Sequence, residues 1–112
     1  MKLRRWDIVF VPVDAKDAAG HPAVVLSHEA RLDDARLERI NVLVGSKKQP
    51  GETVREHQVV LNSADGLEVS TLVDCAFIYT VRKSAILRLA GAVSYVRRAE
   101  IQRKVRAYMG LG

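Results

Sequence analysis

Residues 20–27 read Gly-His-Pro-Ala-Val-Val-Leu-Ser, and this stretch decides the fold that the sequence predicts. It follows a β-branched and aromatic run, Ile8–Val13, across a short polar loop of residues 14–19. Pro12 places the end of that run near an edge or a bend, because proline cannot donate a hydrogen bond inside a sheet. Ala23–Ser27 has the composition of a second strand. The two runs therefore predict a hairpin.

Short strand-like runs continue along the chain. Ile40–Val44 predicts a third strand that Gly45 stops, and Val59–Asn62 predicts a fourth. Leu72–Val81 is the longest candidate, and its nearly continuous apolar character predicts a single central strand buried on both faces. Gly91–Ser94 predicts a short last strand. This pattern is typical of a mainly β protein.

Helical signals are confined to three places. His28–Arg39 predicts either a short helix or a mobile excursion, and Lys83–Leu89 predicts one or two helical turns. Tyr95–Met109 predicts the long helix, with Ser94 as N-cap and Gly110 as its end. One stripe of this helix should pack on the sheet through Ile101, Val105 and Tyr108. We therefore expect a small twisted barrel or roll with a C-terminal α-helix, formed by one domain over residues 1–112.

The composition excludes several classes of protein. Of the 112 residues, 48% are hydrophobic and 28% are charged, as in an ordinary soluble globular protein. No apolar run approaches the roughly 20 residues that cross a bilayer. The N-terminus lacks a signal-peptide pattern, so we expect a cytoplasmic protein without membrane contact. Cys75 is the only cysteine, which excludes an intrachain disulfide and predicts a buried, inert thiol.

Positive charge is concentrated at the C-terminus. The formal net charge is +5, yet residues 1–79 carry 10 Lys or Arg against 12 Asp or Glu. Residues 80–112 carry 8 basic residues against one acidic residue, Glu100. Such asymmetry favours an anionic partner, either a nucleic acid or an acidic protein. The alternative is a solvated helix face with no partner.

The order of these segments resembles the MazF/PemK family of bacterial toxin ribonucleases. Residues 20–27 resemble the family's Arg-Pro-Ala-Val-Val-Leu-Ser, and Ile40–Ser46 resembles its third strand, which ends in a Thr-Ser or Thr-Thr step. Leu72–Ser84 resembles the stretch that begins Val-Val-Arg-Cys-Asp-Gln. Gly91–Ser94 resembles the Gly-x-Leu-Ser that starts the last helix. The resemblance covers nearly the whole chain.

This resemblance implies an SH3-like barrel, also found in the CcdB family, with a C-terminal helix. It implies a homodimer that binds single-stranded RNA near its interface and is held inactive by an acidic antitoxin protein. Cleavage by the ribose 2′-hydroxyl needs a base, an acid and positive charge on the phosphate, but no metal or other cofactor. The chain is thus identified as a candidate toxin endoribonuclease.

Three positions depart from the family's catalytic pattern. His21 stands where the family has the arginine before proline, Asp74 replaces a second arginine, and Ala76 replaces an aspartate. Ser46 keeps a hydroxyl after the third strand, unless Gly45 occupies that register. The catalytic candidates are therefore His21, as a proton-transfer group, and Ser46, as a donor to phosphate. The alternative for both residues is local turn chemistry.

Four basic residues are candidates for following the RNA backbone: Lys16, Lys47, Lys48 and Arg55. Solvated loop side chains are the alternative. Trp6 and Phe10 would either stack on bases or, as their positions favour, pack in the core. His28 and His57 have no partners at ligand spacing, so we expect no metal site. A second functional hypothesis keeps the fold without catalysis: an inactive or CcdB-like module that binds a protein or nucleic acid.

Overall fold

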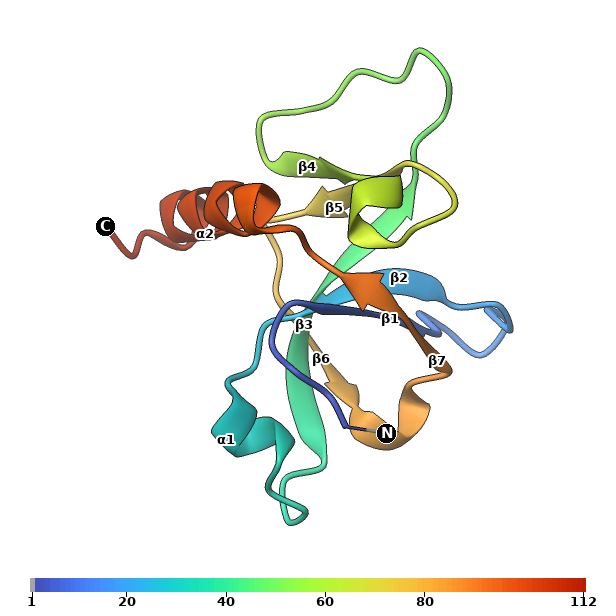
Figure 1. Ribbon diagram of the computed structural model, residues 1–112, viewed down its shortest axis with the longest axis vertical. Helices are drawn as coiled ribbons and strands as arrows, with labels where there is room; N and C mark the ends of the chain where they lie inside the picture. The colour runs from blue at the N-terminus through green and yellow to red at the C-terminus, as the bar shows by residue number, and fades with distance from the viewer. Residues whose placement is uncertain (1) are drawn as a thin grey trace.

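The computed structural model describes residues 2–112 and contains seven strands in one antiparallel sheet (Figure 1). The strand order is β4-β5-β3-β2-β1-β7, and β6 pairs with β3 outside this path. The sheet curls into a half-barrel, which confirms the mainly β fold that the sequence predicts. The strands are β1 (Asp7–Val11), β2 (His21–Val25), β3 (Arg39–Lys47), β4 (Gln58–Leu61), β5 (Thr71–Asp74), β6 (Tyr79–Arg82) and β7 (Arg88–Ala92).

The helices are few. α1 (Glu29–Leu32) is one turn, and two short 3₁₀ turns, η1 (Ser63–Asp65) and η2 (Lys83–Ala85), follow β4 and β6. α2 (Tyr95–Met109) has the predicted bounds, and Gly110 ends it with φ 69°. Ser94 is its N-cap by position, but the side chain makes no capping bond. None of the helices within residues 2–112 is long and apolar enough to span a membrane.

β3 joins the two parts of the sheet. Its first half pairs with β6 and β2, whereas Gly45 to Lys47 pair with β5. At the switch a side chain on Gly45 would collide with Thr71, whose Cγ2 lies 2.7 Å from an ideal Cβ position. The close crossing of β3 and β5 therefore requires glycine there.

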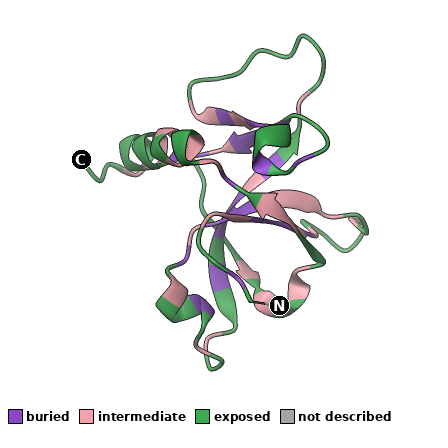
Figure 2. Ribbon diagram, in the orientation of Figure 1, coloured by how far each residue is buried: buried purple, intermediate pink, exposed green. Residues whose placement is uncertain are grey.

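The central strands are buried on both faces, as the purple segments of Figure 2 show. Ile8, Val24 and Leu43 point into the main core, which α2 joins through Ile101. Their neighbours along the same strands point into a second cluster on the opposite face, which includes Val9, Val25, Val42, Ile40 and Leu32. Alternation of side chains along each strand produces both layers.

The predicted single strand over Leu72–Val81 is wrong. β5 ends at Asp74, whose Oδ1 accepts a hydrogen bond from the Ala76 N–H at 2.8 Å and turns the chain. β6 then leaves β5 and pairs with the first half of β3. β5 is buried, but β6 is mostly exposed. The bend could not be predicted from the sequence, because the apolar run contains no Gly or Pro at this point.

Other boundaries also differ from the sequence prediction. Lys83–Leu89 forms only the short η2 turn, and Leu87 donates its N–H to the Phe10 carbonyl at 2.8 Å. β7 consequently starts at Arg88 rather than near Gly91. The pairing of β7 with β1 outweighs the helical propensity of this segment.

Trp6, immediately before β1, has a positive φ of 77°. Glycine adopts this conformation without strain, whereas a residue with a Cβ does not. Here the indole ring packs against the main core. The apolar area that the ring buries offsets a backbone cost of roughly 1–2 kcal/mol. The core-packing interpretation of Trp6 is thus confirmed.

Cys75 is fully buried, as predicted, and burial raises the pKa of its thiol to about 12. Because the thiolate is the reactive form, we expect no reaction with an aromatic disulfide reagent at about pH 8 in the folded protein. Unfolding in guanidinium chloride should release one reactive thiol per chain. Labelling of the native protein as fast as of the unfolded chain would contradict this prediction.

Candidate functional site

A cavity of about 470 Å³ lies where β2 begins, and we call it the His21 cavity. Its walls come from β1, β2, the end of β3, β7 and the segment after η1. His21, Lys47 and Arg88 supply its basic side chains, and Glu68 supplies the only carboxylate. Apolar walls include Phe10 and Leu67. The cavity thus combines apolar walls with a net positive lining.

His21 makes a close contact with an acidic partner. Its Nδ1 lies 2.7 Å from Oδ2 of Asp17, four residues earlier in the β1–β2 loop. A carboxylate in this position favours the tautomer with a proton on Nδ1. The neutral ring then carries an unprotonated Nε2. The pair therefore has the form of an oriented proton acceptor.

Asp17 also holds the loop that precedes His21. Its carboxylate accepts hydrogen bonds from the N–H groups of Val13 and Gly20, at 3.0 and 3.1 Å. The Val13 N–H, followed by His21, lowers the pKa of this carboxyl below its ordinary value of 3.8. Gly20 itself has φ 77° and lies against Val11 and Leu87, so the loop requires glycine there. Asp17 was not predicted as a site residue, because its contact with His21 depends on the conformation of this loop and not on a helical spacing.

Arg88 is a second cavity residue that was not predicted from the sequence. It lies opposite Phe10 in the β1–β7 pairing, and its Cζ sits 3.9 Å from the centre of the Phe10 ring. This distance is that of a cation–π contact. Nothing in the sequence signals it, because 78 positions separate the two residues.

The predicted site residues fall into two groups. Lys47 lines the cavity together with His21. Ser46 is exposed and does not line it, because successive side chains of β3 point to opposite faces. Gly45 shares the face of Lys47. The catalytic role of Ser46 stays a prediction.

The remaining basic candidates lie in loops outside the cavity lining. Lys16 is exposed in the β1–β2 loop, next to Asp17. Lys48 begins the long β3–β4 loop, and its N–H donates to the Ser70 carbonyl at 2.9 Å. Arg55 is exposed near the end of the same loop. None of these three residues lines the His21 cavity.

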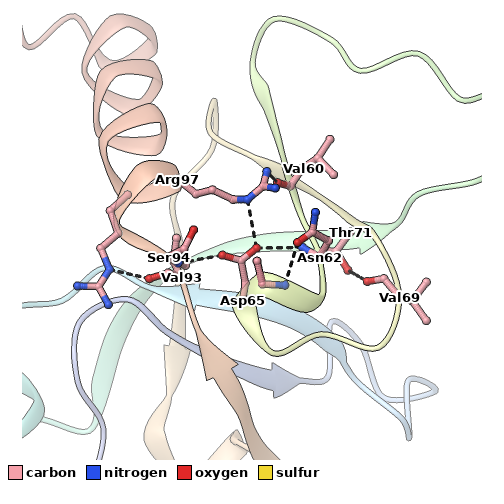
Figure 3. A network of polar contacts seen from close by, with 10 residues as sticks. Val60, Asn62, Asp65, Val69, Thr71, Val93, Ser94 and Arg97 are labelled. Atoms are coloured by element: carbon pink, nitrogen blue, oxygen red, sulfur yellow. Dashed lines mark hydrogen bonds and ion pairs between the residues drawn. The ribbon is translucent and has the colours of Figure 1, made fainter.

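A buried carboxylate joins η1 to the start of α2 (Figure 3). Asp65 is 1% exposed, and its oxygens accept hydrogen bonds from the N–H groups of Asn62 and Ser94, at 2.9 and 2.8 Å. Arg97 pairs with it at 3.3 Å and also donates to the Val60 carbonyl. Arg97 thus holds α2 against β4 and stabilises the fold, so the basic face of α2 is partly structural.

The chain matches the family model described as PemK-like, MazF-like toxin of type II toxin-antitoxin system, over residues 4–109. It belongs to this toxin family. Among curated proteins, none matches this chain in sequence.

Solved structures agree in fold with this PemK-like toxin. An endoribonuclease from a mycobacterial species matches with a TM-score of 0.76 and 15% identity, covering 98% of this chain and 93% of that one. A mycobacterial endoribonuclease in complex with its cognate antitoxin gives 0.73 and 16%, covering 97% and 94%. A MazE-MazF structure from Deinococcus radiodurans gives 0.75 and 16%, covering 98% of each chain. At these identities the likeness shows the fold.

Two of the positions that depart from the family pattern, Asp74 and Ala76, lie in the bend after β5 of this toxin. Asp74 caps the bend after β5 and lies 3.9 Å from Nε2 of His57. The His57 ring in turn meets the Tyr108 ring of α2 edge-on, with centroids 6.0 Å apart. Ala76 is half-buried in the same bend. Among residues 2–112, no group of three His, Cys, Asp or Glu side chains is arranged to hold a metal.

A second cavity of this PemK-like toxin, of about 530 Å³, lies between α2, the N-terminal segment and α1, and we call it the helix groove. Its lining contains three arginines and no carboxylate. Apolar residues from four segments complete it, so it offers both apolar contact and positive charge. The lining includes Arg5, Arg31, Arg106, Trp6, Leu26, Ile78 and Val105.

Proposed function

We propose that this toxin cuts single-stranded RNA without a metal, with His21 as the proton acceptor. The observation that supports this proposal is the Asp17–His21 pair at a cavity that also holds Lys47 and Arg88. Nε2 of His21 takes the proton of a ribose 2′-hydroxyl, and the freed O2′ attacks the adjacent phosphorus. The P–O5′ bond breaks, and the leaving oxygen takes a proton from the imidazolium or from water. The products are a 2′,3′-cyclic phosphate and a 5′-hydroxyl.

A single assay tests this proposal. Purified, antitoxin-free protein is incubated with a long single-stranded RNA in the presence of a chelator. We expect cleavage, and a single 2′-deoxy substitution at the cut site should abolish it because the attacking oxygen is gone. No cleavage at any pH would favour the alternative, a CcdB-like binding module without catalysis. Asp74 also supports this alternative, because a carboxylate repels phosphate where the family pattern has an arginine.

Salt dependence tests whether the predicted loop residues bind RNA. Replacing Lys47 and Lys48 with alanine should weaken binding to all single-stranded sequences alike and flatten the slope of log affinity against log salt by about 0.7 per lost phosphate contact. Lys16→Ala and Arg55→Ala should act in the same direction. Binding to a 2′-deoxy oligonucleotide, measured by fluorescence anisotropy, checks this. If the salt slope is unchanged by these substitutions, the lysines do not contact the RNA backbone.

We further propose an acidic antitoxin protein as partner, a homodimer as the assembly and the cytoplasm as the location. One of the similar solved structures is a complex with a cognate antitoxin, and this supports the proposal of an antitoxin partner. The helix groove supports it too, since three arginines and apolar walls suit an acidic segment with apolar side chains. Exposed apolar residues at Phe77, Ile78 and Tyr79 support a protein interface at β6.

A further inference from the structure

Arg88 has no role in the proton transfer, yet its side chain lines the His21 cavity. We propose that Arg88, stacked on Phe10, binds the phosphate that is attacked in this cavity. This inference rests on the proposed ribonuclease function and adds the residue that supplies permanent positive charge. It also assigns Phe10 a positioning role.

The proposed reaction needs a positive charge next to the phosphate, and Arg88 can supply it. To accept a proton, His21 must be neutral, so it cannot also neutralise the phosphate in the same step. Lys47 is a permanent cation in the lining, but Glu68 lies in the same lining and opposes it. The ionised Asp17 beside His21 adds a second negative charge, so without Arg88 the fixed charges of Lys47, Glu68 and Asp17 sum to −1. Arg88 offsets this excess while His21 is neutral.

The position of Arg88 suits a phosphate. Phe10 pairs with Arg88 on β7 and with Pro22 on β2, and all three residues line the cavity. The stacked ring holds the face of the guanidinium, so its N–H edge stays available for hydrogen bonds. Among residues 2–112, Arg88 has no carboxylate within ion-pair distance. A planar guanidinium in this state is suited to bind two phosphate oxygens at once.

The two flanking strands fix this geometry. The N–H of Leu87 donates to the Phe10 carbonyl at 2.8 Å, directly beside the stacked pair. His21 lies opposite Val11, one position beyond Phe10, in the β1–β2 pairing. His21 and Arg88 thus pair with adjacent positions of β1, whose side chains point to opposite faces of the sheet. What joins them is the cavity at the end of this strand, which both residues line.

The test compares Arg88→Gln with Arg82→Gln. Arg82 is an exposed arginine at the end of β6 that lines neither cavity, so it controls for net charge. Binding is measured with a 2′-deoxy oligonucleotide, and cleavage is measured with the matching RNA. We expect Arg88→Gln to lower kcat at least about tenfold and to flatten the salt slope of binding by about 0.7, with Tm unchanged.

Two further variants separate charge from geometry. Arg88→Lys should restore the salt slope but only part of kcat, because an ammonium is a point charge without the planar fork. Phe10→Leu keeps an apolar wall but removes the ring, and should lower kcat more than it changes KM. A purely structural role for the pair would instead lower Tm in all three variants and leave the salt slope unchanged.

The outcomes also separate this inference from the proposed function. If the wild type cuts RNA and Arg88→Gln behaves like Arg82→Gln, the role of Arg88 is overturned and the ribonuclease stands. If the wild type does not cut RNA, the proposed ribonuclease function is wrong. Binding of the 2′-deoxy oligonucleotide then still tests whether Arg88 binds phosphate. A lower affinity and a flatter salt slope in Arg88→Gln, but not in Arg82→Gln, support phosphate binding by Arg88. Equal binding by the two variants overturns it.

Discussion

Replacing His21 with alanine is expected to slow RNA cleavage at least about a hundredfold, because a positioned proton acceptor contributes roughly 10²–10⁴ to the rate. Affinity for a 2′-deoxy oligonucleotide should change little, since the neutral ring adds no charge. Asp17→Asn should cost less, because it weakens the orientation of the imidazole without removing it. Single-turnover kinetics with saturating protein measures the chemical step directly.

His28→Ala is the matched control. His28 is an exposed histidine before α1, where its Nδ1 accepts the Ala30 N–H at 3.1 Å, and it does not line the His21 cavity. Its removal should leave the cleavage rate within about twofold, although the α1 cap is lost at a cost of about 1 kcal/mol. Full activity of His21→Ala would exclude His21 from the chemistry.

The pH profile gives an independent check. We expect the cleavage rate of the wild type to change between about pH 5 and 8, because a proton acceptor works only in its unprotonated form. Hydrogen bonds keep the pKa of Asp17 below 3.8, so this carboxylate is ionised throughout. Its contribution to stability is lost only as pH falls through that lowered pKa. His21→Arg should remove the pH dependence, because arginine does not titrate there.

Asp65→Ala is expected to destabilise the fold by about 3 kcal/mol. The substitution leaves the Arg97 guanidinium without its carboxylate and the N–H groups of Asn62 and Ser94 without acceptors. Tm should fall by roughly 10 °C in a chain of this size. Thermal unfolding followed by circular dichroism measures the change.

Asp33→Ala controls for the loss of an acidic residue. Asp33 is exposed at the end of α1, where its backbone N–H, not its carboxylate, bonds to Glu29. Such a surface change should stay within about 0.5 kcal/mol. If Asp65→Ala unfolds at the same temperature as Asp33→Ala, the network of Figure 3 contributes no net stability.

The sequence predicted most strands and the long helix because local patterns determine them. β-branched runs mark β1 to β4, and Gly110 marks the end of α2. The bend after Asp74 was missed because an Asx-type hydrogen bond makes it, and an aspartate inside an apolar run carries no distinct signal. The start of β7 was missed because its partner, β1, is far away in sequence.

The candidate site was predictable only where one segment carries it. His21 was proposed from its motif, and Lys47 from its place next to Ser46 at the end of a predicted strand. Ser46 and Lys47 looked equivalent because their opposite faces depend on the exact strand register, which the sequence left open by one residue. Arg88 meets Phe10 only across the folded sheet, so no local pattern contains the pair.

Trp6 is the only tryptophan of the chain, and its ring lies where the main core meets the helix groove. Its left-handed backbone and packed ring fix the indole in one place, so nearly all long-wavelength fluorescence of this protein arises from a single site. That site borders Arg5 and Arg106 but does not line the His21 cavity. The molecule therefore carries an optical reporter in the helix groove but not in the His21 cavity, and an event in the one is spectroscopically separable from an event in the other without any label.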